Sequence, residues 1–324
     1  MTRNRILVTG AAGFIGAKVC ELLLQSGAEI DGVDNLNDYY SPKLKEYRIQ
    51  RLKNFDNFRF YKLDIENFEI LENIFSQNKF SAVINLAARA GVRASIDNPF
   101  VYATTNFIGT LNLLELSAKY NVPKFVLASS SSVYAGEQVP FTENMQVDKP
   151  ISPYAATKKS AELIAYAYHH LYGIDVSVLR FFTVYGAAGR PDMSYFQFIE
   201  KIKKEQEIVI YGDGTQKRDF TYIQDIAEGV VAAIKDVGYE IINLGGGKTP
   251  IEINFMIKLI EQKLGKKAKI VYKDFHNADM NETGADISKA KLLLDWTPKV
   301  DFENGLEQTI RWHIDNNEFL KTIQ

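Results

Sequence analysis

The sequence has little of what marks a secreted or membrane-inserted protein. Its 324 residues include one cysteine, Cys20, so an intrachain disulfide is excluded. Cys20 falls among apolar residues on an expected helix, and we interpret it as a small core residue in a reducing compartment. No apolar run is long enough for a signal peptide or a membrane span. We therefore expect a soluble cytoplasmic protein with no membrane partner.

Charge and metal ligands are also scarce. The formal net charge is -2, so bulk attraction to nucleic acid or to an anionic membrane is not expected. We interpret the lysine clusters KIKKE and KKAK as solvated surfaces. Three of the four histidines, His169, His170 and His313, fall on expected helices without a second ligand at useful spacing. We predict no metal site and no nucleic-acid partner.

Seven short apolar runs predict the strands of one sheet. They are RILVTG, EIDGVD, FRFYKLD, SAVINLA, KFVLASS, DVSVLRFF and EIINLGG. Helix-length segments separate most of them, and strands with so little charge are typical of a parallel sheet covered on both faces. The sequence therefore predicts an α/β protein with a doubly wound parallel sheet of the Rossmann type.

After residue 186 the pattern loosens into shorter helices and polar loops, which indicates a smaller second α/β domain at the C-terminal end. RDFTYIQDIAEGVVAAI and EIINLGGG look like a return of the chain to the main sheet. The second domain is then discontinuous. We assign residues 1–180 plus 219–245 to the main domain, and residues 181–218 plus 246–324 to the smaller one.

The first strand leads into the glycine-rich turn GAAGFIG at residues 10–16, and a helix follows directly. Glycines there let the backbone approach a pyrophosphate, which the N–H groups at the helix N-terminus bind. Asp34 ends the second strand, where its carboxylate can accept both ribose hydroxyls of an adenosine. That carboxylate repels a 2′-phosphate, and no Arg or Lys occurs between Asp34 and Lys43. The predicted cofactor is NAD rather than NADP, bound by the main domain.

Other residues at strand ends extend this predicted site. Asp64, after the third strand, can reach the adenine edge, and Ala87 and Ala88, after the fourth, let the backbone pass close to the cofactor. Each of these alone is as readily explained by structure. The predicted cofactor set is Gly10, Gly13, Phe14, Ile15, Gly16, Asp34, Asn35, Asp64, Ile65, Ala87 and Ala88, with Tyr154 and Lys158.

A candidate catalytic pair follows the fifth strand, which ends in the serine run 129–132. In SPYAATKKSAE, Ser152 suits a helix N-cap and Pro153 the first helical position. Tyr154 and Lys158 then lie one turn apart on the same face. A free tyrosine, with a pKa of ~10, is a poor base, but a fixed ammonium and an oxidised nicotinamide both favour its phenolate. An ordinary surface pair is the alternative, which the upstream glycine turn disfavours.

Together, GAAGFIG, Asp34, SSSSVY and YAATK resemble the extended short-chain dehydrogenase/reductase superfamily, specifically its nucleotide-sugar epimerases and dehydratases. The resemblance covers nearly the whole chain, including YGDGTQKRDFTYIQDI. It implies that Tyr154 is the general base and that Lys158 holds the nicotinamide ribose and tunes Tyr154. Ser130 is implied as the hydroxyl partner, and Ser131 and Ser132 as lining the same cavity.

The residues before VY distinguish the branches of this family. Dehydratases usually carry an Asp-Glu pair there, and UDP-xylose synthases typically a Glu, whereas this chain has Ser131 and Ser132. Thr183 stands where many sugar epimerases have Asn. RFFTVYG followed by GRPDM, and DNLNDYYSPKLKEYRIQRL after Asp34, are similar to UDP-glucuronate 4-epimerases.

A uronic acid presents a carboxylate that a threonine hydroxyl and an arginine can bind. Thr183 and Arg190 are the candidates, with Arg190 acting as a clamp through two N–H bonds. The alternative for Arg190 is a solvated arginine on a loop. Arg93 is a weaker candidate for the same carboxylate or for a phosphate.

The resemblance also implies a diphosphate and uracil site. Tyr211 is implied to stack on uracil and Arg218 to meet the pyrophosphate, while Asp279 matches an Asp of galactose-type epimerases. His276 stands where those enzymes have a phosphate-binding Arg. The predicted substrate set is Arg93, Ser130, Ser131, Ser132, Thr183, Arg190, Tyr211, Arg218 and Asp279.

The function implied is interconversion of UDP-glucuronate and UDP-galacturonate through a 4-keto intermediate, with NAD staying bound. UDP-glucose or UDP-N-acetylglucosamine 4-epimerase and UDP-glucuronate decarboxylase remain alternatives. A non-catalytic dinucleotide-binding protein has no need of Tyr154 and Lys158. The resemblance further implies a homodimer formed by the helices of IGTLNLLELSAKYN and SAELIAYAYHHLYG, whose apolar faces could equally cover the sheet.

Overall fold

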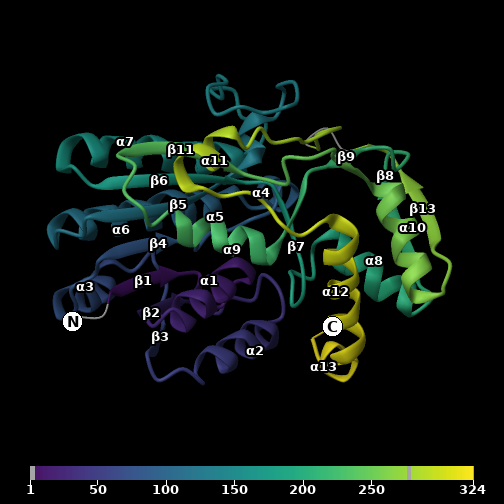
Figure 1. Cartoon of the computed structure of the whole chain (residues 1–324), viewed down its shortest axis with the longest axis horizontal. Helices are drawn as coiled ribbons and strands as arrows, with labels where there is room; N and C mark the ends of the chain where they lie inside the picture. The colour runs from purple at the N-terminus through teal and green to yellow at the C-terminus, as the bar shows by residue number, and fades with distance from the viewer. Residues whose placement is uncertain (1–3, 276–278, 324) are drawn as a thin grey trace.

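A seven-stranded parallel sheet forms the centre of the molecule (Figure 1). The computed structural model describes residues 4–275 and 279–323. The strand order is β11-β6-β5-β4-β1-β2-β3, so the direction of winding reverses between β1 and β4, where ligands bind in such sheets. The strands are β1 (Arg5–Thr9), β2 (Glu29–Asp34), β3 (Phe58–Lys62), β4 (Ala82–Asn85), β5 (Lys124–Ser130), β6 (Asp175–Phe181) and β11 (Tyr239–Leu244). The predicted doubly wound fold is confirmed.

Alternating side chains of the strands pack into two separate cores. On β1, Ile6 and Val8 belong to one core and Leu7 to the other, because successive strand residues point to opposite faces. The first face is covered by α1 (Phe14–Gln25), α2 (Pro42–Leu52) and α9 (Ile223–Ala232), and the second by α3 (Phe68–Gln77), α6 (Gly109–Lys119) and α7 (Pro153–Tyr172). Cys20 is fully buried in the first core, as interpreted from the sequence.

A smaller group of elements lies beside the carboxyl end of the sheet, at the right of Figure 1. There β8 (Glu207–Tyr211) and β13 (Lys269–Lys273) pair in parallel and pack with α8 (Ser194–Lys203) and α10 (Ile253–Leu264). The chain ends with α11 (Ser288–Leu294), α12 (Phe302–Asp315) and α13 (Asn317–Lys321). Ile199, Ile257 and Ile310 belong to the same core as Val8, so the first core is continuous with this group. The domain boundaries stay a prediction.

The chain leaves the main sheet after β6 through β7 (Thr183–Tyr185), which pairs with β10 (Phe220–Tyr222) in a separate two-stranded sheet. The expected return of RDFTYIQDIAEGVVAAI and EIINLGGG to the main sheet is therefore right for β11, whereas β10 pairs with β7 instead. Because β5 and β11 already occupy both edges of β6, β10 pairs with the continuation of that strand.

Short elements fill the loops. They are α4 (Val92–Asp97), α5 (Pro99–Tyr102), the π-helix η1 (Ala103–Ile108), the 3-10 helix η2 (Ser131–Tyr134), β9 (Lys217–Arg218) and β12 (Ile251–Glu252). Within residues 4–275 and 279–323, no helix combines the length and the apolar character needed to cross a bilayer.

Candidate active site

The turn after β1 leaves no room for a Cβ at Gly10, Gly13 or Gly16. Gly10 has a φ of +69°, and a Cβ there would lie 2.8 Å from the backbone of Leu86 and Ala87. A Cβ on Gly16 would lie 2.0 Å from the carbonyl oxygen of Gly10. Gly13 caps α1 without any side-chain hydrogen bond, which leaves the first N–H groups of the helix available to an anion. The turn therefore suits a pyrophosphate at close range.

Asp34 is fixed at the end of β2 by two backbone donors. The N–H of Ala12 donates to Oδ2 at 3.1 Å and that of Leu36 to Oδ1 at 2.8 Å. The side-chain amide of Asn35 in turn donates to Asp64 at 2.6 Å. The carboxylate of Asp34 thus faces the pocket from the second strand, as ribose binding requires.

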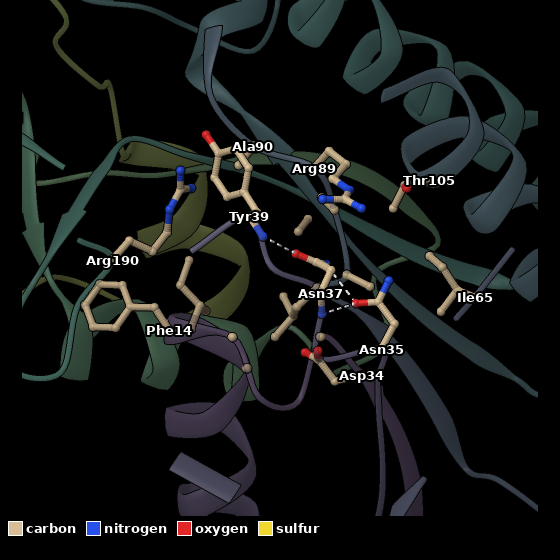
Figure 2. Close-up of a pocket in the computed structure, with 18 of the residues that line it drawn as sticks. Phe14, Asp34, Asn35, Asn37, Tyr39, Ile65, Arg89, Ala90, Thr105 and Arg190 are labelled. Atoms are coloured by element: carbon tan, nitrogen blue, oxygen red, sulfur yellow. Dashed lines mark hydrogen bonds between the residues drawn. The ribbon is translucent and has the colours of Figure 1, made fainter. Parts of the chain in front are cut away.

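Every residue of the predicted cofactor set lines one pocket along the carboxyl edge of the sheet. Figure 2 shows Asn35 and Ile65 at one end and Tyr39 and Arg190 toward the other, with Asp34 below. The glycine turn that a Cβ would fill and the carboxylate of Asp34 both fit NAD. These contacts with the cofactor remain predictions.

The predicted catalytic residues Ser130, Tyr154 and Lys158 line the same pocket. Helix α7 begins where the sequence indicates, because the Ser152 hydroxyl accepts from the N–H of Ala155 at 3.2 Å and Pro153 follows the cap. Nζ of Lys158 donates to the carbonyl oxygen of Ala128 at 2.9 Å. The structure therefore brings the tyrosine, the lysine and the serine to the same pocket.

Burial sets the proton affinities of this group. It lowers the pKa of Lys158 to about 8, although the negative charge of Glu162 opposes the shift. It raises the pKa of Tyr154, against a hydrogen bond with Ser130 and the positive charge of Arg190. Arg190 thus favours the phenolate of Tyr154 and is electrostatically linked to the catalytic group.

A buried ion pair lies behind the catalytic helix. Arg180 on β6 donates to both carboxylate oxygens of Glu162 on α7, at 2.9 and 2.7 Å, and both side chains are 1% exposed. The Ser129 hydroxyl donates to the same carboxylate at 2.6 Å. The Arg180 guanidinium also lies 4.7 Å from the ring centre of Tyr134. These contacts tie α7 to β5 and β6, one turn after Lys158.

Arg190 faces the pocket but already has a carboxylate partner. Its Nε and Nη2 contact the two oxygens of Asp192 at 3.0 and 2.5 Å, and its guanidinium lies 5.7 Å from the ring centre of Tyr39. Within the described residues, Thr183 does not line this pocket, although its neighbours Phe182 and Val184 do. Of the two predicted carboxylate ligands, Arg190 alone is therefore at the cofactor pocket.

The other predicted substrate residues form a second group outside that pocket. Arg93 pairs with Asp279, and its guanidinium lies 3.9 Å from the ring centre of Tyr211. Burial lowers the pKa of Arg218, an effect that Asp279 opposes and Arg93 increases. His276 lies outside the described residues. Residues from α4, β8, β9 and the segment after 278 thus form one connected group, in which Arg93 links Tyr211 to Asp279.

Ser131 and Ser132 start the 3-10 helix η2 rather than line the cofactor pocket. Ser131 is buried, and the hydroxyl of Ser132 lies 3.1 Å from that of Ser130. Ser132 also donates its backbone N–H to the Ser130 hydroxyl at 3.1 Å. Ser132 can therefore orient the Ser130 side chain.

A protein-family model described as the NAD dependent epimerase/dehydratase family matches residues 6–245. The chain belongs to this family. The resemblance drawn from the glycine turn and the YAATK motif is thereby confirmed.

Similar proteins of this epimerase family are known in sequence and in structure. The UDP-glucuronate 4-epimerase of Thermodesulfobacterium geofontis (strain OPF15) is 59% identical over 318 residues, covering 98% of each chain. The Bacillus cereus UDP-glucuronic acid 4-epimerase, crystallised with UDP-glucuronic acid and NAD, has a TM-score of 0.91 at 38% identity, over 96% of this chain and 99% of that one. The UDP-glucose 4-epimerase of Thermotoga maritima, crystallised with UDP-glucose, has a TM-score of 0.87 at 35% identity, over 99% and 100%.

Two buried cations were missed by sequence reasoning, Lys45 in the pocket of this epimerase and Arg48 next to it. Lys45 and Arg48 lie on α2 and are each 4% exposed. Nζ of Lys45 donates to the carbonyl oxygen of Asn37 at 2.8 Å, and burial lowers its pKa to about 8 although Asp34 opposes the shift. Both cations share the buried helix face with Leu44, Ile49 and Leu52. Charged residues within an apolar helical stripe were the available signal.

Arg89 is a third missed residue. It lines the pocket directly after Ala87 and Ala88, and Figure 2 shows its side chain above Asn37. Asn106 holds its backbone through hydrogen bonds of 2.8 and 3.0 Å. Its buried Nε has no hydrogen-bond partner among the described residues. A single arginine after AA carries no signal of this in the sequence.

Proposed function

We infer that the protein is a UDP-glucuronate 4-epimerase, which interconverts UDP-glucuronate and UDP-galacturonate with NAD bound. The observation that carries this inference is the position of Arg190, whose guanidinium lines the pocket that also contains Tyr154 and Lys158. A fixed cation beside the acid/base group suits a sugar with a carboxylate next to the reacting carbon. The similarity to the enzyme of Thermodesulfobacterium geofontis supports the same substrate.

The residues present fit the cofactor at both of its recognition points. The glycine turn before α1 would hold the pyrophosphate, and Asp34 the adenosine ribose. Bound there, NAD would supply hydride transfer from the sugar C4 and back to either face of the resulting ketone.

Tyr154 moves the proton that accompanies this oxidation. Its phenolate takes the proton of the C4 hydroxyl and gives it back when the ketone is reduced. Lys158, with a pKa of about 8, carries its charge at neutral pH. We propose that this charge stabilises the phenolate, as the charge of Arg190 does. Ser130 shares the same sugar oxygen through its hydroxyl.

The orientation of the substrate carboxylate matters because the oxidised sugar is a β-keto acid. Such an acid loses carbon dioxide when its C5–C6 bond lies parallel to the π orbitals of the C4 ketone. We propose that Arg190 holds the carboxylate away from that alignment. We also propose that the substrate extends beyond the cofactor pocket to Thr183, which lies between the lining residues Phe182 and Val184 and would be a second donor. In the structure Asp192 accepts from Nε and Nη2 of Arg190, so the substrate carboxylate has to displace this partner or bind through the remaining N–H groups of the guanidinium. Arg190 then both selects the uronic acid and protects it.

The nucleotide end of the substrate is assigned to the second group of residues. We propose that Tyr211 stacks on uracil and that Arg218 and Arg93 meet the diphosphate, with Asp279 holding Arg93 in place. One face of the Tyr211 ring is covered by Arg93, so a base would use the other face or move the guanidinium.

A homodimer in the cytoplasm completes the proposal. Helix α7 exposes several large apolar side chains, which is unusual for a helix of a monomer. They are Leu163 (60% exposed), Tyr166 (53%) and Leu171 (68%). Light scattering that gives twice the chain mass of 36.7 kDa supports the dimer, and a single-chain mass contradicts it.

The proposed activity is tested by giving the purified protein UDP-glucuronate, UDP-glucose and UDP-N-acetylglucosamine in separate reactions. We expect UDP-galacturonate as the main product, a kcat/KM highest for UDP-glucuronate, and no carbon dioxide. A higher kcat/KM for either neutral sugar contradicts the substrate assignment. UDP-pentose as the main product from UDP-glucuronate contradicts the reaction.

A further inference from the structure

The guanidinium of Arg48 joins three segments that are far apart in the sequence. Its Nη1 donates to the carbonyl oxygen of Ala12 at 3.0 Å and to the hydroxyl of Tyr40 at 2.7 Å. Its Nη2 donates to the carbonyl oxygens of Ala188 at 2.7 Å and Gly189 at 3.1 Å, and its Nε contacts Ala188 at 3.2 Å. The side chain therefore uses all three nitrogens without reaching the pocket itself.

The two turns that Arg48 joins lie next to residues proposed to bind the cofactor and the substrate. Ala12 lies in the glycine turn, and its N–H donates to Asp34 at 3.1 Å. Ala188 and Gly189 immediately precede Arg190. Ala188 has a φ of +55°, a left-handed conformation that is unfavourable for a non-glycine residue. The turn before Arg190 is thus held in an unfavourable backbone conformation by contacts from α2.

The same segment supplies a neighbour of Arg190. Tyr39 places its ring 5.7 Å from the Arg190 guanidinium, and the next residue, Tyr40, places its ring 5.5 Å from that of Arg48. Arg48 therefore fixes the backbone before Arg190. It also contacts Tyr40, which directly follows Tyr39, the residue whose ring packs against Arg190.

We propose that Arg48 is a positioning residue that holds the Arg190 turn at a fixed place relative to the cofactor turn, and thereby determines selectivity for a uronic acid. The inference rests on the proposed function of Arg190 as the carboxylate ligand. Arg48 itself does not touch the substrate. A planar guanidinium is required, because an ammonium has no rigid array of donors to span carbonyl oxygens from two turns.

Loosening Arg48 has a specific chemical consequence. If the sugar carboxylate is held less firmly, the 4-keto intermediate reaches the geometry for decarboxylation. The C5–C6 bond then breaks, C6 leaves as carbon dioxide, and its electron pair stays on C5 as an enolate, which takes a proton from water. The product is a UDP-4-ketopentose, which becomes a UDP-pentose when the hydride taken from C4 is returned to the ketone. A loss of fold stability alone produces neither.

The test compares Arg48→Lys and Arg48→Gln with Arg51→Gln. Arg51 is an exposed arginine of the same helix that donates to the hydroxyl of Tyr47 at 3.2 Å. For each variant we would measure kcat and KM with UDP-glucuronate, carbon dioxide and UDP-pentose formed per turnover, NAD affinity by calorimetry, and the unfolding midpoint. Wild-type protein in the same assays tests the proposed function separately.

We expect both Arg48 variants to raise KM for UDP-glucuronate on the order of tenfold, with a smaller fall in kcat, and to release carbon dioxide that the wild type does not. Arg51→Gln should match the wild type. Arg48 variants that fold but keep the wild-type KM and release no carbon dioxide overturn the proposal, whatever their stability. A wild type that makes no UDP-galacturonate refutes the proposed function instead.

Tyr40→Phe serves if the Arg48 variants do not fold, because it removes only the hydroxyl that accepts from Nη1 of Arg48. We expect KM to rise and carbon dioxide to be released as in the Arg48 variants, but to a smaller extent. No change in either quantity in this variant also overturns the proposal.

Discussion

Nζ of Lys158 lies 2.9 Å from the carbonyl oxygen of Ala128, two residues before Ser130 on β5. This hydrogen bond places the ammonium at the end of the strand, one helical turn from Tyr154. The backbone, rather than a carboxylate, holds the charge in place. Burial without a direct anionic partner explains why the pKa of Lys158 falls to about 8.

Replacing Lys158 should abolish activity and stabilise the fold. The folded-state pKa of about 8 lies below the ordinary value of 10.5, so the unfolded chain binds the proton more tightly. The charge therefore destabilises the fold in full below about pH 8, by ~3 kcal/mol, and the penalty fades as the pH rises to about 10.5. Lys158→Met should abolish turnover yet raise the free energy of unfolding near neutral pH, as measured by urea unfolding of the ligand-free protein.

The control for this prediction is Lys119→Met, which removes a lysine that is 58% exposed. We expect no comparable gain in the free energy of unfolding from this variant. A Lys158→Met gain that stays the same from about pH 7 to about pH 10 would show that the pKa of Lys158 is not its cause.

Tyr154→Phe should separate chemistry from binding. The ring remains while the hydroxyl that moves the proton is lost, so we expect turnover to fall by about 10²–10⁴-fold with little change in NAD affinity. Calorimetry with NAD and a product assay measure the two quantities. Tyr272→Phe, at an exposed position, should leave both unchanged, and full turnover by Tyr154→Phe would refute the proposed mechanism.

Arg190→Ala should impair the uronic acid selectively. Loss of the guanidinium removes the carboxylate ligand, so kcat/KM for UDP-glucuronate should fall at least tenfold more than that for UDP-glucose, about 1.4 kcal/mol of selectivity. Asp192→Asn keeps the cation and should cause a much smaller change. Equal losses for both sugars in Arg190→Ala would mean that the turn has no part in selecting the carboxylate.

Replacing one partner of the buried ion pair should lower the free energy of unfolding more than replacing both partners. Glu162→Gln leaves the charge of Arg180 without its partner and should cost about 3–5 kcal/mol of unfolding free energy. The double variant Glu162→Leu with Arg180→Met should lose less than Glu162→Gln alone. Urea unfolding of the three proteins tests this order, and a double variant less stable than the single one would contradict it.

Local patterns were sufficient to predict the sheet and the cofactor turn. The apolar runs and the spacing from Gly10 to Gly16 act within one strand, turn and helix, so their outcome depends on neighbours in the sequence. The N-cap at Ser152 is equally local, and α7 begins at Pro153 as predicted.

Contacts between distant segments could not be derived in this way. Arg48 meets Ala188 across 140 residues and Arg93 meets Asp279 across 186. The sequence shows the residue types but not which of them meet, except where a family resemblance supplies the pairing. Strand β10 illustrates the same limit, because its partner depends on β11 having filled the edge of β6.

The inferred reaction is tested with UDP-glucuronate that carries deuterium at C4. Because the same hydride leaves C4 and returns to it, mass spectrometry should find the deuterium retained in UDP-galacturonate, with no carbon dioxide released. Loss of the label to solvent, or UDP-pentose in place of UDP-galacturonate, would contradict epimerisation by transient oxidation at C4.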